Sequence, residues 1–319
     1  MAKYKMILDL DTGIDDALAI AYALATPEAD LIGIIGSYGN VVTRRGVQNS
    51  LNLLELLGHP EIPVFMGAKH SSTSDHFNVM PVSAQIHGTN GLGEVALNKA
   101  KREVENNSGV DFLISAAHNY QKRLLLVPTG PLTNLSAALD KDPTIADLIG
   151  HVTLMGGALT VPGNVSPVTE ANINQDPVPA NRVFRSSLKL TMIGLDVTTR
   201  TLLTTNETQQ WRDLGTVAGQ KYADIVDFYI DAYKVTSPHL GGCALHDPLA
   251  VAAAVEPDLV STIFLNMKVD TKAPFAGRTI GDETRINAPA TQTQAAVNVD
   301  KIRFVKEFMT KLTELFKNN

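Results

Sequence analysis

The chain has 319 residues, of which 44% are hydrophobic and 19% are charged, as in an ordinary globular protein. Its net charge of −6, with no basic stripe, argues against a protein that binds nucleic acid non-specifically. The single cysteine, Cys243, excludes an internal disulfide and a cysteine-based zinc site, and no apolar run reaches the roughly 18 residues of a membrane span. We therefore expect a cytoplasmic protein without nucleic-acid or membrane partners.

The first part of the chain alternates apolar strand-like segments with amphipathic segments. Strands are expected at residues 5–10, 31–36 and 63–66, and helices at residues 15–25 and 43–57. The stretch 67–93 is polar and rich in glycine, so it is expected to be a long loop, and loops of that length are usually functional or disordered.

The middle of the chain continues this alternation. Strands are expected at residues 122–127, 151–155 and 188–194, and helices at 110–120, 132–139, 143–149 and 179–185. A second long loop is expected at residues 158–175. The last part is mainly helical. Its expected helices are 207–214, 219–235, 247–255 and 304–316, with a loop at 238–245 and an edge strand at 263–269.

Strands that alternate with helices predict an α/β fold, an open and mostly parallel Rossmann-like sheet with helices on both faces. No linker, repeat or low-complexity tract divides the chain, so residues 1–319 are expected to form a single domain. In such sheets, ligands bind beyond the carboxyl ends of the strands. Several polar residues follow predicted strands at those ends: Asp9, Asp11, Asn40, Thr129 and Asp196.

Four carboxylates fall within eight residues at the end of the first predicted strand: Asp9, Asp11, Asp15 and Asp16. Carboxylates that are held together near a core repel one another and resist desolvation, and a hard cation such as Ca²⁺ or Mg²⁺ relieves both effects. One of the adjacent pair, Asp15 and Asp16, can bind the metal while the other acts as a general base. The alternative is that Asp15 only caps a helix and Asp9 is solvated.

Three other segments carry candidate site residues. His246 and Asp247 open an apolar helix, where Asp247 is either another metal ligand or only a first-turn acid. His87 lies among glycines in the first long loop, either beside a ligand or on the surface. In the second loop, amide and carboxylate side chains could bind the hydroxyls of a sugar or cap the loop itself. These are Asn164, Glu170 and Asn172.

Nucleophilic catalysis has no good candidate, since the chain has neither a Gly-x-Ser-x-Gly elbow nor a Walker-type phosphate loop. Cys243 is expected to be a small packing residue. A phosphohydrolase of the haloacid dehalogenase type is one rival, because residues 9–12 also fit its strand-end Asp-x-Asp-x-Thr pattern. That interpretation leaves Asp15, Asp16, His246 and Asp247 without a role.

The pattern of motifs resembles the inosine-uridine-preferring nucleoside hydrolases, over residues 7–255 and in the order of that family. The matching segments are residues 9–17, 39–40, 86–88, 127–134, 154–157, 163–164, 170–172 and 246–248. The resemblance implies the nucleoside hydrolase fold and the hydrolysis of ribonucleosides to ribose and free base, in nucleoside salvage. It also implies a tightly held Ca²⁺ and a homodimer or homotetramer. A second rival is a non-catalytic nucleoside-binding protein of the same fold.

The resemblance also implies a role for each matching residue. The calcium ligands would be Asp11, Asp16, Asp247 and the backbone carbonyl of Thr129. Asp15 would take a proton from a calcium-bound water that attacks an oxocarbenium-like ribosyl group. The ribose hydroxyls would be bound by Asn40, Asn164, Glu170 and Asn172. His246 would protonate or hydrogen-bond the departing base.

The base-binding residues are the least constrained part of this assignment. We expect them to be His87, Met155, Tyr229 and Tyr233, although an amphipathic core role for the two tyrosines fits the pattern as well. Two positions depart from the family. Thr12 replaces a frequent proline, which changes the stiffness of the turn, and Ala171 replaces a frequent aromatic residue at the sugar pocket. The base preference therefore stays open.

Overall fold

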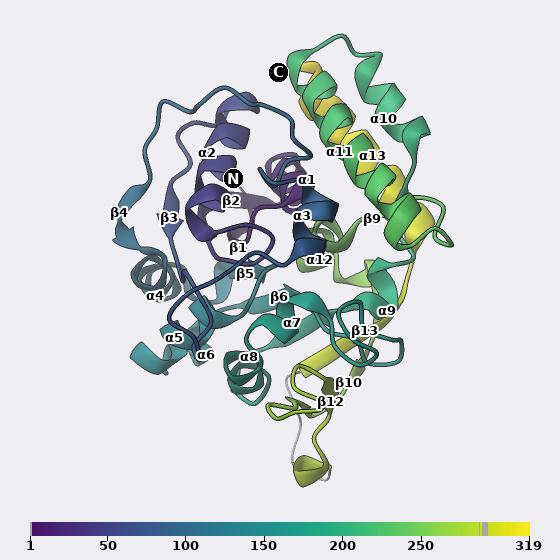
Figure 1. The fold of residues 1–319 in the computed structure, drawn as a ribbon. Helices are drawn as coiled ribbons and strands as arrows, with labels where there is room; N and C mark the ends of the chain where they lie inside the picture. The colour runs from purple at the N-terminus through teal and green to yellow at the C-terminus, as the bar shows by residue number, and fades with distance from the viewer. Residues whose placement is uncertain (1, 287, 289–292) are drawn as a thin grey trace.

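The computed structural model describes residues 2–286, 288 and 293–319. Its centre is a nine-stranded sheet with the strand order β10-β13-β7-β6-β5-β1-β2-β3-β4 (Figure 1). The pair β10 and β13 is antiparallel, and the other neighbouring strands pair in parallel. The predicted α/β fold with an open, mostly parallel sheet is therefore confirmed.

The strands of this sheet are β1 (Tyr4–Leu10), β2 (Ala29–Gly36), β3 (Val64–Met66), β4 (Glu105–Ser108), β5 (Leu124–Pro128), β6 (His151–Met155), β7 (Leu190–Ile193), β10 (Val260–Phe264) and β13 (Thr293–Val299). Two small antiparallel sheets lie outside it. They pair β8 (Leu202–Leu203) with β9 (Cys243–Ala244), and β11 (Met267–Val269) with β12 (Thr279–Gly281).

Helices cover both faces of the sheet. The core of one face includes side chains of α1 (Ile14–Leu24), α2 (Thr43–Leu56), α12 (His246–Val255) and α13 (Lys301–Lys317). The core of the other includes those of α4 (Gly109–Tyr120), α5 (Thr133–Lys141), α6 (Ile145–Leu148) and α8 (Pro177–Phe184). In Figure 1, α10 (Thr205–Arg212) and α11 (Val217–Thr236) run beside α13. The remaining helical segments are short: α3 (Pro81–His87), α7 (Ala171–Gln175), α9 (Leu195–Thr198), η1 (Gln121–Arg123), η2 (Pro257–Leu259) and η3 (Glu283–Arg285).

The central strand shows why the strands read as unbroken apolar runs. Met6, Leu8 and Leu10 of β1 pack into the core of one face, and Ile7 packs into the core of the other. Because successive side chains of a strand point to opposite faces, a strand that is covered on both faces carries a run of consecutive apolar residues. In β1 this run is Met6–Leu8, and Asp9 interrupts it near the carboxyl end of the strand.

The order in which successive strands are added to the sheet reverses at β1. β2, β3 and β4 add to one side of β1, whereas β5 pairs with its other side. The carboxyl ends of β1 and β5 meet there, since Asp9 pairs with Pro128 and the Thr129 amide donates to the Asp9 carbonyl. Such switch points are where open α/β sheets bind their ligands.

Several sequence-based predictions of elements are wrong in detail. The segment 67–93 is not all loop, because α3 forms near its end and places His87 as the last helical residue. The segment 158–175 likewise ends in α7. The expected edge strand at 263–269 is two strands, β10 in the main sheet and β11 in a small one.

Two strands of the main sheet were not predicted at all, and neither were the short strands β8, β9 and β12 of the small sheets. β4 is polar and largely exposed, and it lies at the sheet edge, where little apolar surface has to be covered. β13 is only partly apolar, and it lies second from the opposite edge.

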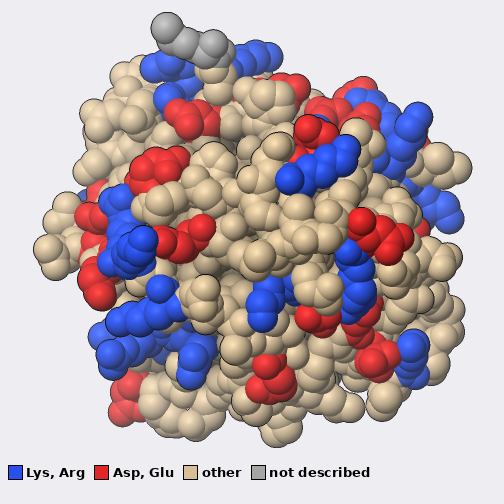
Figure 2. Space-filling model, turned by 90° about the horizontal axis from the view of Figure 1, so that it is seen from above, with Lys and Arg blue, Asp and Glu red and all other residues tan. Residues whose placement is uncertain are grey.

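Two further features concern the surface charge and the helices. Figure 2 shows one face of the molecule, on which Lys and Arg side chains are interspersed with Asp and Glu. Among the described residues, no helix is long and apolar enough to cross a membrane.

Candidate active site

Four buried carboxylates gather where the sheet reverses direction. Asp11 follows β1, Asp15 and Asp16 lie in the first turn of α1, and Asp247 lies in the first turn of α12, which packs against α1. None of the four is more than 7% exposed. One carboxylate oxygen each from Asp15, Asp16 and Asp247 lies within 4.8 Å of the others. Segments more than 200 residues apart in the sequence thus complete one acidic cluster.

Hydrogen bonds hold these carboxylates, but three of the four keep one oxygen without a partner among the described residues. Asp16 accepts from the Gly13 amide at 2.8 Å and from the Thr129 hydroxyl at 2.7 Å, and Asp11 accepts from the Asn40 amide at 2.7 Å. Other buried oxygens have no hydrogen-bond partner within the part of the chain that the structure describes. These are Oδ1 of Asp11, Oδ1 of Asp15 and Oδ1 of Asp247.

Burial and mutual repulsion make this cluster costly as a set of anions. Burial, with the charge of Asp15 beside it, raises the pKa of Asp16 to about 6, and burial raises the pKa of Asp15 to about 6. Burial together with the neighbouring carboxylates raises the pKa of Asp11 and the pKa of Asp247 well above their usual range. Unpartnered oxygens of hard carboxylate ligands fit a hard divalent cation, which would supply the missing interaction.

A close backbone approach beside Asp11 explains one glycine of the motif. A Cβ atom at Gly39 would lie 1.8 Å from Asp11 Oδ2, so any other residue would displace the carboxylate. The next residue, Asn40, donates its amide to that same oxygen. The Gly39-Asn40 pair therefore holds Asp11 in place, and the Asn40 side chain also reaches Asp16 Oδ2 at 3.4 Å.

The polar side chains of the second loop form hydrogen bonds within that loop and with the residues at the ends of β5 and β6. Glu170 caps α7 by accepting from the amides of Asn172 and Ile173. Asn172 donates from its side chain to the carbonyl of Thr129 at 2.7 Å and of Met155 at 3.2 Å. Asn172 thereby joins the second loop to the Thr129 carbonyl at the acidic cluster.

Asn164 lies at the exposed end of the predicted sugar-binding set. Its side-chain oxygen accepts from the Ala171 amide at 3.0 Å. The self-capping alternative for this loop therefore describes Asn164 and Glu170 in this structure, and their binding of a sugar stays a prediction.

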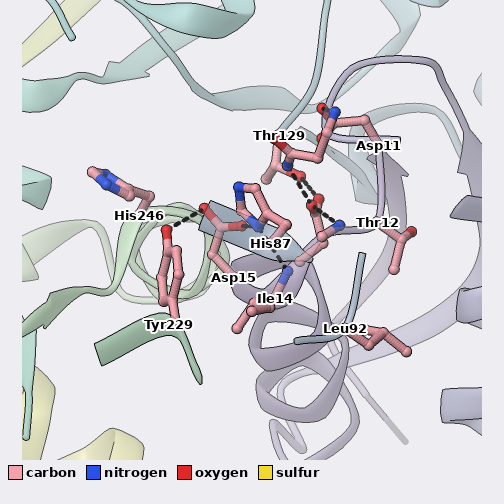
Figure 3. Close-up of polar contacts among 12 residues, drawn as sticks. Asp11, Thr12, Ile14, Asp15, His87, Leu92, Thr129, Tyr229 and His246 are labelled. Atoms are coloured by element: carbon pink, nitrogen blue, oxygen red, sulfur yellow. Dashed lines mark hydrogen bonds and ion pairs between the residues drawn. The ribbon is translucent and has the colours of Figure 1, made fainter. Parts of the chain in front are cut away.

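A row of four aromatic rings forms the other end of the site. Ring centroids are 5.4 Å apart for His87 and Tyr229, 4.9 Å for Tyr229 and Tyr233, and 6.5 Å for Tyr233 and His246. Asp15 joins this row to the acidic cluster, because the Tyr229 hydroxyl donates to its Oδ2 at 3.4 Å and His87 Nδ1 lies 3.9 Å from its Oδ1 (Figure 3). The structure thus brings together three of the predicted base-binding residues with His246.

Both histidines of the row are neutral at physiological pH. Burial lowers the pKa of His87 to about 4, and burial also lowers the pKa of His246 to about 4. The Ile14 amide donates to His87 Nδ1 at 3.1 Å, so the hydrogen of that ring is on Nε2. His246 contacts a hydroxyl at each nitrogen, Tyr233 at Nε2 and Thr198 at Nδ1, both at 2.7 Å.

Asp9 lies at the end of β1 and is held by a hydrogen bond at one oxygen, while its Oδ2 has no partner among the described residues. Its Oδ1 accepts from the Asn134 side chain at 2.8 Å, and Asn134 in turn accepts from the Ala68 amide at 2.7 Å. Asp9 is only 1% exposed, which does not suit a nucleophile that must reach a phosphoester. Cys243 is fully buried in β9, as expected of a packing residue, and burial raises the pKa of its thiol.

Sequence reasoning missed two carboxylates that anchor the long loops. Asp176 accepts from the amide and hydroxyl of Ser72 and from the Thr133 hydroxyl. Asp196, noted only as following a strand, accepts from the amides of Leu159 and Thr160. The one local signal for Asp176 is the following proline, which is typical of a helix start.

Comparisons with known proteins agree with this arrangement. The family model for inosine-uridine preferring nucleoside hydrolases matches residues 6–306. Uridine nucleosidase 1 of Arabidopsis thaliana is 34% identical over 279 residues, covering 88% of this chain and 82% of that protein. The pyrimidine-specific ribonucleoside hydrolase RihA of Escherichia fergusonii is 32% identical over 301 residues, covering 94% and 95%.

Solved structures extend the likeness to the whole fold. A purine-preferring ribonucleoside hydrolase from Gardnerella vaginalis is 58% identical, with a TM-score of 0.98 and coverage of 99% of this chain and 100% of that one. A plant nucleoside hydrolase is 31% identical, with a TM-score of 0.91 and coverage of 98% and 99%.

Proposed function

The chain belongs to the inosine-uridine preferring nucleoside hydrolase family and hydrolyses N-glycosyl bonds of ribonucleosides, and we propose that it does so with calcium held at the acidic cluster. The observation that supports the cation is the set of buried, unpartnered carboxylate oxygens, three of which belong to Asp11, Asp15 and Asp247. The proposed ligands are Asp11, Asp16, Asp247 and the Thr129 carbonyl. Bound calcium would orient the attacking water and lower its pKa.

Asp15 is the proposed general base. It lies in the cluster, and it accepts a hydrogen bond from Tyr229 of the aromatic row, so it connects the two ends of the site. Burial raises its pKa to about 6, which suits a base that takes a proton near neutral pH. The water adds to the anomeric carbon of ribose, and its proton passes to Asp15.

Ribose is proposed to lie between the cluster and the second loop, bound by Asn40, Asn164, Glu170 and Asn172. As the bond to the base breaks, positive charge develops on the sugar ring. The carboxylates and amide oxygens around it stabilise that charge. Asn164 and Glu170 would exchange hydrogen bonds with their own loop for hydrogen bonds with the sugar.

The departing base is proposed to lie along the aromatic row with His87, Met155, Tyr229 and Tyr233. His246 acts there with Tyr233, because Tyr233 occupies its Nε2. Negative charge develops on the base as it leaves, and a hydrogen-bond donor or proton donor at this end lowers the barrier. The enzyme would thereby supply free base and ribose to salvage.

The base preference we propose is for purine ribonucleosides. It is supported by the likeness to the purine-preferring ribonucleoside hydrolase from Gardnerella vaginalis, whose sequence is 58% identical. Pyrimidine specificity is the second candidate, because the uridine nucleosidase and RihA relatives are 34% and 32% identical. We also propose a homodimer or homotetramer, as is expected for the family.

A reducing-sugar assay with purified protein, calcium and a panel of inosine, guanosine, adenosine, uridine and cytidine tests this proposal. We expect the protein to release ribose from members of this panel, with the highest kcat/KM for a purine ribonucleoside. Faster cleavage of uridine would contradict the base preference alone. If no member of the panel is cleaved in the presence of calcium, the proposed function is wrong.

A further inference from the structure

The two nitrogens of His246 are held by hydroxyls from different elements. Tyr233 comes from α11 and Thr198 is the last residue of α9, and each hydroxyl lies 2.7 Å from its ring nitrogen. Thr198 is fully buried. The proposed mechanism gives a role to the Tyr233 hydroxyl but none to the Thr198 hydroxyl.

Thr198 differs from the next threonine along the chain. The hydroxyl of Thr199 donates back to the Leu195 carbonyl of its own helix at 2.8 Å, which is the usual local bond of a threonine at a helix end. The Thr198 hydroxyl instead contacts His246, 48 residues away in the sequence. The Thr198 hydroxyl thus links α9 to α12 through His246, and the local geometry of α9 does not require this contact.

A neutral imidazole has one donor nitrogen and one acceptor nitrogen, and the partner of one nitrogen decides which is which. If Thr198 donates to Nδ1, the ring hydrogen is on Nε2 and points to the Tyr233 oxygen. The hydroxyl hydrogen of Tyr233 is then free to be donated elsewhere. In the opposite tautomer, Tyr233 donates to His246 and has no hydrogen left for a ligand.

We propose that Thr198 is a positioning residue that donates to His246 Nδ1, keeps the ring hydrogen on Nε2, and so leaves the Tyr233 hydroxyl free to donate to the departing base. This inference rests on the proposed function, because it needs a leaving base at the aromatic row. It adds α9 to the elements that build the site. No proton changes place in it: Thr198 sets the direction of a chain of hydrogen bonds that ends at the base.

The same short helix also holds the second loop. Asp196 accepts from the Leu159 and Thr160 amides and from the Thr160 hydroxyl. The two residues of α9 thus face different parts of the site, with Asp196 toward the loop of the predicted ribose ligands and Thr198 toward His246. A substitution at Thr198 that leaves Asp196 in place therefore acts on the base end alone.

The test compares two substrates that differ in their need for help at the leaving group. Inosine has a poor leaving group, whereas 4-nitrophenyl β-D-ribofuranoside releases a phenolate that stabilises its own charge. For Thr198→Val, we expect kcat/KM for inosine to fall on the order of tenfold to hundredfold, as for loss of a hydrogen bond that acts in the transition state. Cleavage of the nitrophenyl riboside should change by less than about threefold.

Two further variants act as controls. Thr198→Ser keeps the hydroxyl and should restore the ratio of the two kcat/KM values to that of the wild type. Thr199→Val removes a hydroxyl from the same helix that does not contact His246, and it should leave both activities unchanged. A Thr198→Val variant that loses both activities equally, or neither, would overturn the inference although the proposed function stands. If the wild-type protein cleaves neither substrate, the proposed function itself is wrong, and this inference with it.

A direct measurement does not depend on catalysis. Long-range ¹H–¹⁵N correlation spectra show which ring nitrogen of a histidine carries the hydrogen, and the signal of His246 can be assigned by its loss in His246→Gln. We expect the hydrogen on Nε2 in the wild-type protein and in Thr198→Ser, and a mixture of tautomers in Thr198→Val. Hydrogen on Nδ1 in the wild-type protein, or an unchanged spectrum in Thr198→Val, would overturn the inference.

Discussion

Both ends of the site bury polar side chains, but they differ in how fully other groups of the chain satisfy these side chains with hydrogen bonds. At the acidic end, Asp11, Asp15, Asp16 and Asp247 are buried together, and three of them have carboxylate oxygens without a described partner. At the aromatic end, both nitrogens of His246 have a partner, and His87 Nδ1 accepts from the Ile14 amide. The groups of the chain itself satisfy the aromatic end, whereas the acidic end keeps carboxylate oxygens that a cation could bind.

This difference follows from what burial does to each residue type. Burial disfavours the charged form, so it raises the pKa of a carboxyl group and lowers the pKa of a histidine. The histidines can stay neutral and still donate and accept hydrogen bonds. Each carboxylate that becomes charged repels its neighbours, and a bound cation would relieve that repulsion. The negative charge of the carboxylates is what stabilises a ribosyl cation. The comparison predicts that substitutions at the two ends have separable effects on cation binding.

The largest expected effect is that of Asp15→Asn, which removes the base but keeps the size of the side chain. Turnover of inosine should fall on the order of 10³-fold, within the range for loss of a general base. Calcium affinity, measured by isothermal titration calorimetry, should change far less, because Asp15 is not one of the proposed ligands. Asp16→Asn is the matched control, in which both properties should be lost. Parallel losses in Asp15→Asn would contradict its role as the base.

A smaller loss is expected at the aromatic end. Tyr233→Phe removes the hydroxyl beside His246 Nε2 and keeps the ring in the row, so kcat for inosine should fall on the order of 10²-fold. Calcium affinity should not change. Tyr120→Phe, in α4 on the other face of the sheet, is the control and should be as active as the wild type. Weaker calcium binding in Tyr233→Phe would show that the two ends are not separable.

The pH dependence of stability separates the ends without any mutation. Burial raises the pKa of Asp9 to about 7 and those of Asp15 and Asp16 to about 6, above the value near 3.8 of an exposed aspartate. These groups, with Asp11 and Asp247, bind more protons in the folded state than in the unfolded state, whereas His87 and His246, whose pKa burial lowers to about 4, bind fewer. Because five carboxyl groups outweigh two histidines, the free energy of unfolding without cation should fall as the pH rises from about 4 to about 7. Each unit of pKa difference corresponds to about 1.4 kcal/mol.

Urea denaturation in EDTA at pH 5 and at pH 7 measures this slope. Calcium binds the deprotonated cluster of the folded state, so in its presence the loss of stability toward pH 7 should disappear or reverse. Greater stability at pH 7 than at pH 5 in EDTA would mean that the cluster is not strained by its own charge.

The smallest effect is expected for Asp9→Asn. The variant keeps an oxygen that accepts from Asn134 and removes a buried charge, so stability should change by about 1 kcal/mol and activity by less than about tenfold. Loss of activity comparable to that of Asp15→Asn would place Asp9 in the reaction. It would also contradict the supporting role that its bond to Asn134 indicates.

The acidic end was predictable from the sequence to a large extent. The spacing of Asp9, Asp11, Asp15 and Asp16 places four carboxylates close together at a strand end near the core. That spacing was the reason to predict a cation site. The alternation of strands and helices likewise predicted the parallel sheet. Polar edge strands such as β4 escaped prediction, because a strand that covers little of the core needs no apolar run.

The aromatic end was much less predictable. Tyr229 and Tyr233 lie on α11 at a spacing that fits a buried helix face equally well, and only the tertiary structure places them beside His87 and His246. The anchoring roles of Asp176 and Asp196 also depend on long-range contacts with loops that have no sequence pattern of their own.

Calcium depletion and restoration test the central claim most directly. Ribose release from inosine is measured for protein that has been stripped with a chelator and dialysed, before and after calcium is added back. We predict that the stripped protein is inactive and that activity returns in full at about one calcium ion per chain. Undiminished ribose release by protein that holds no divalent cation would contradict the claim that the acidic end needs a metal to work.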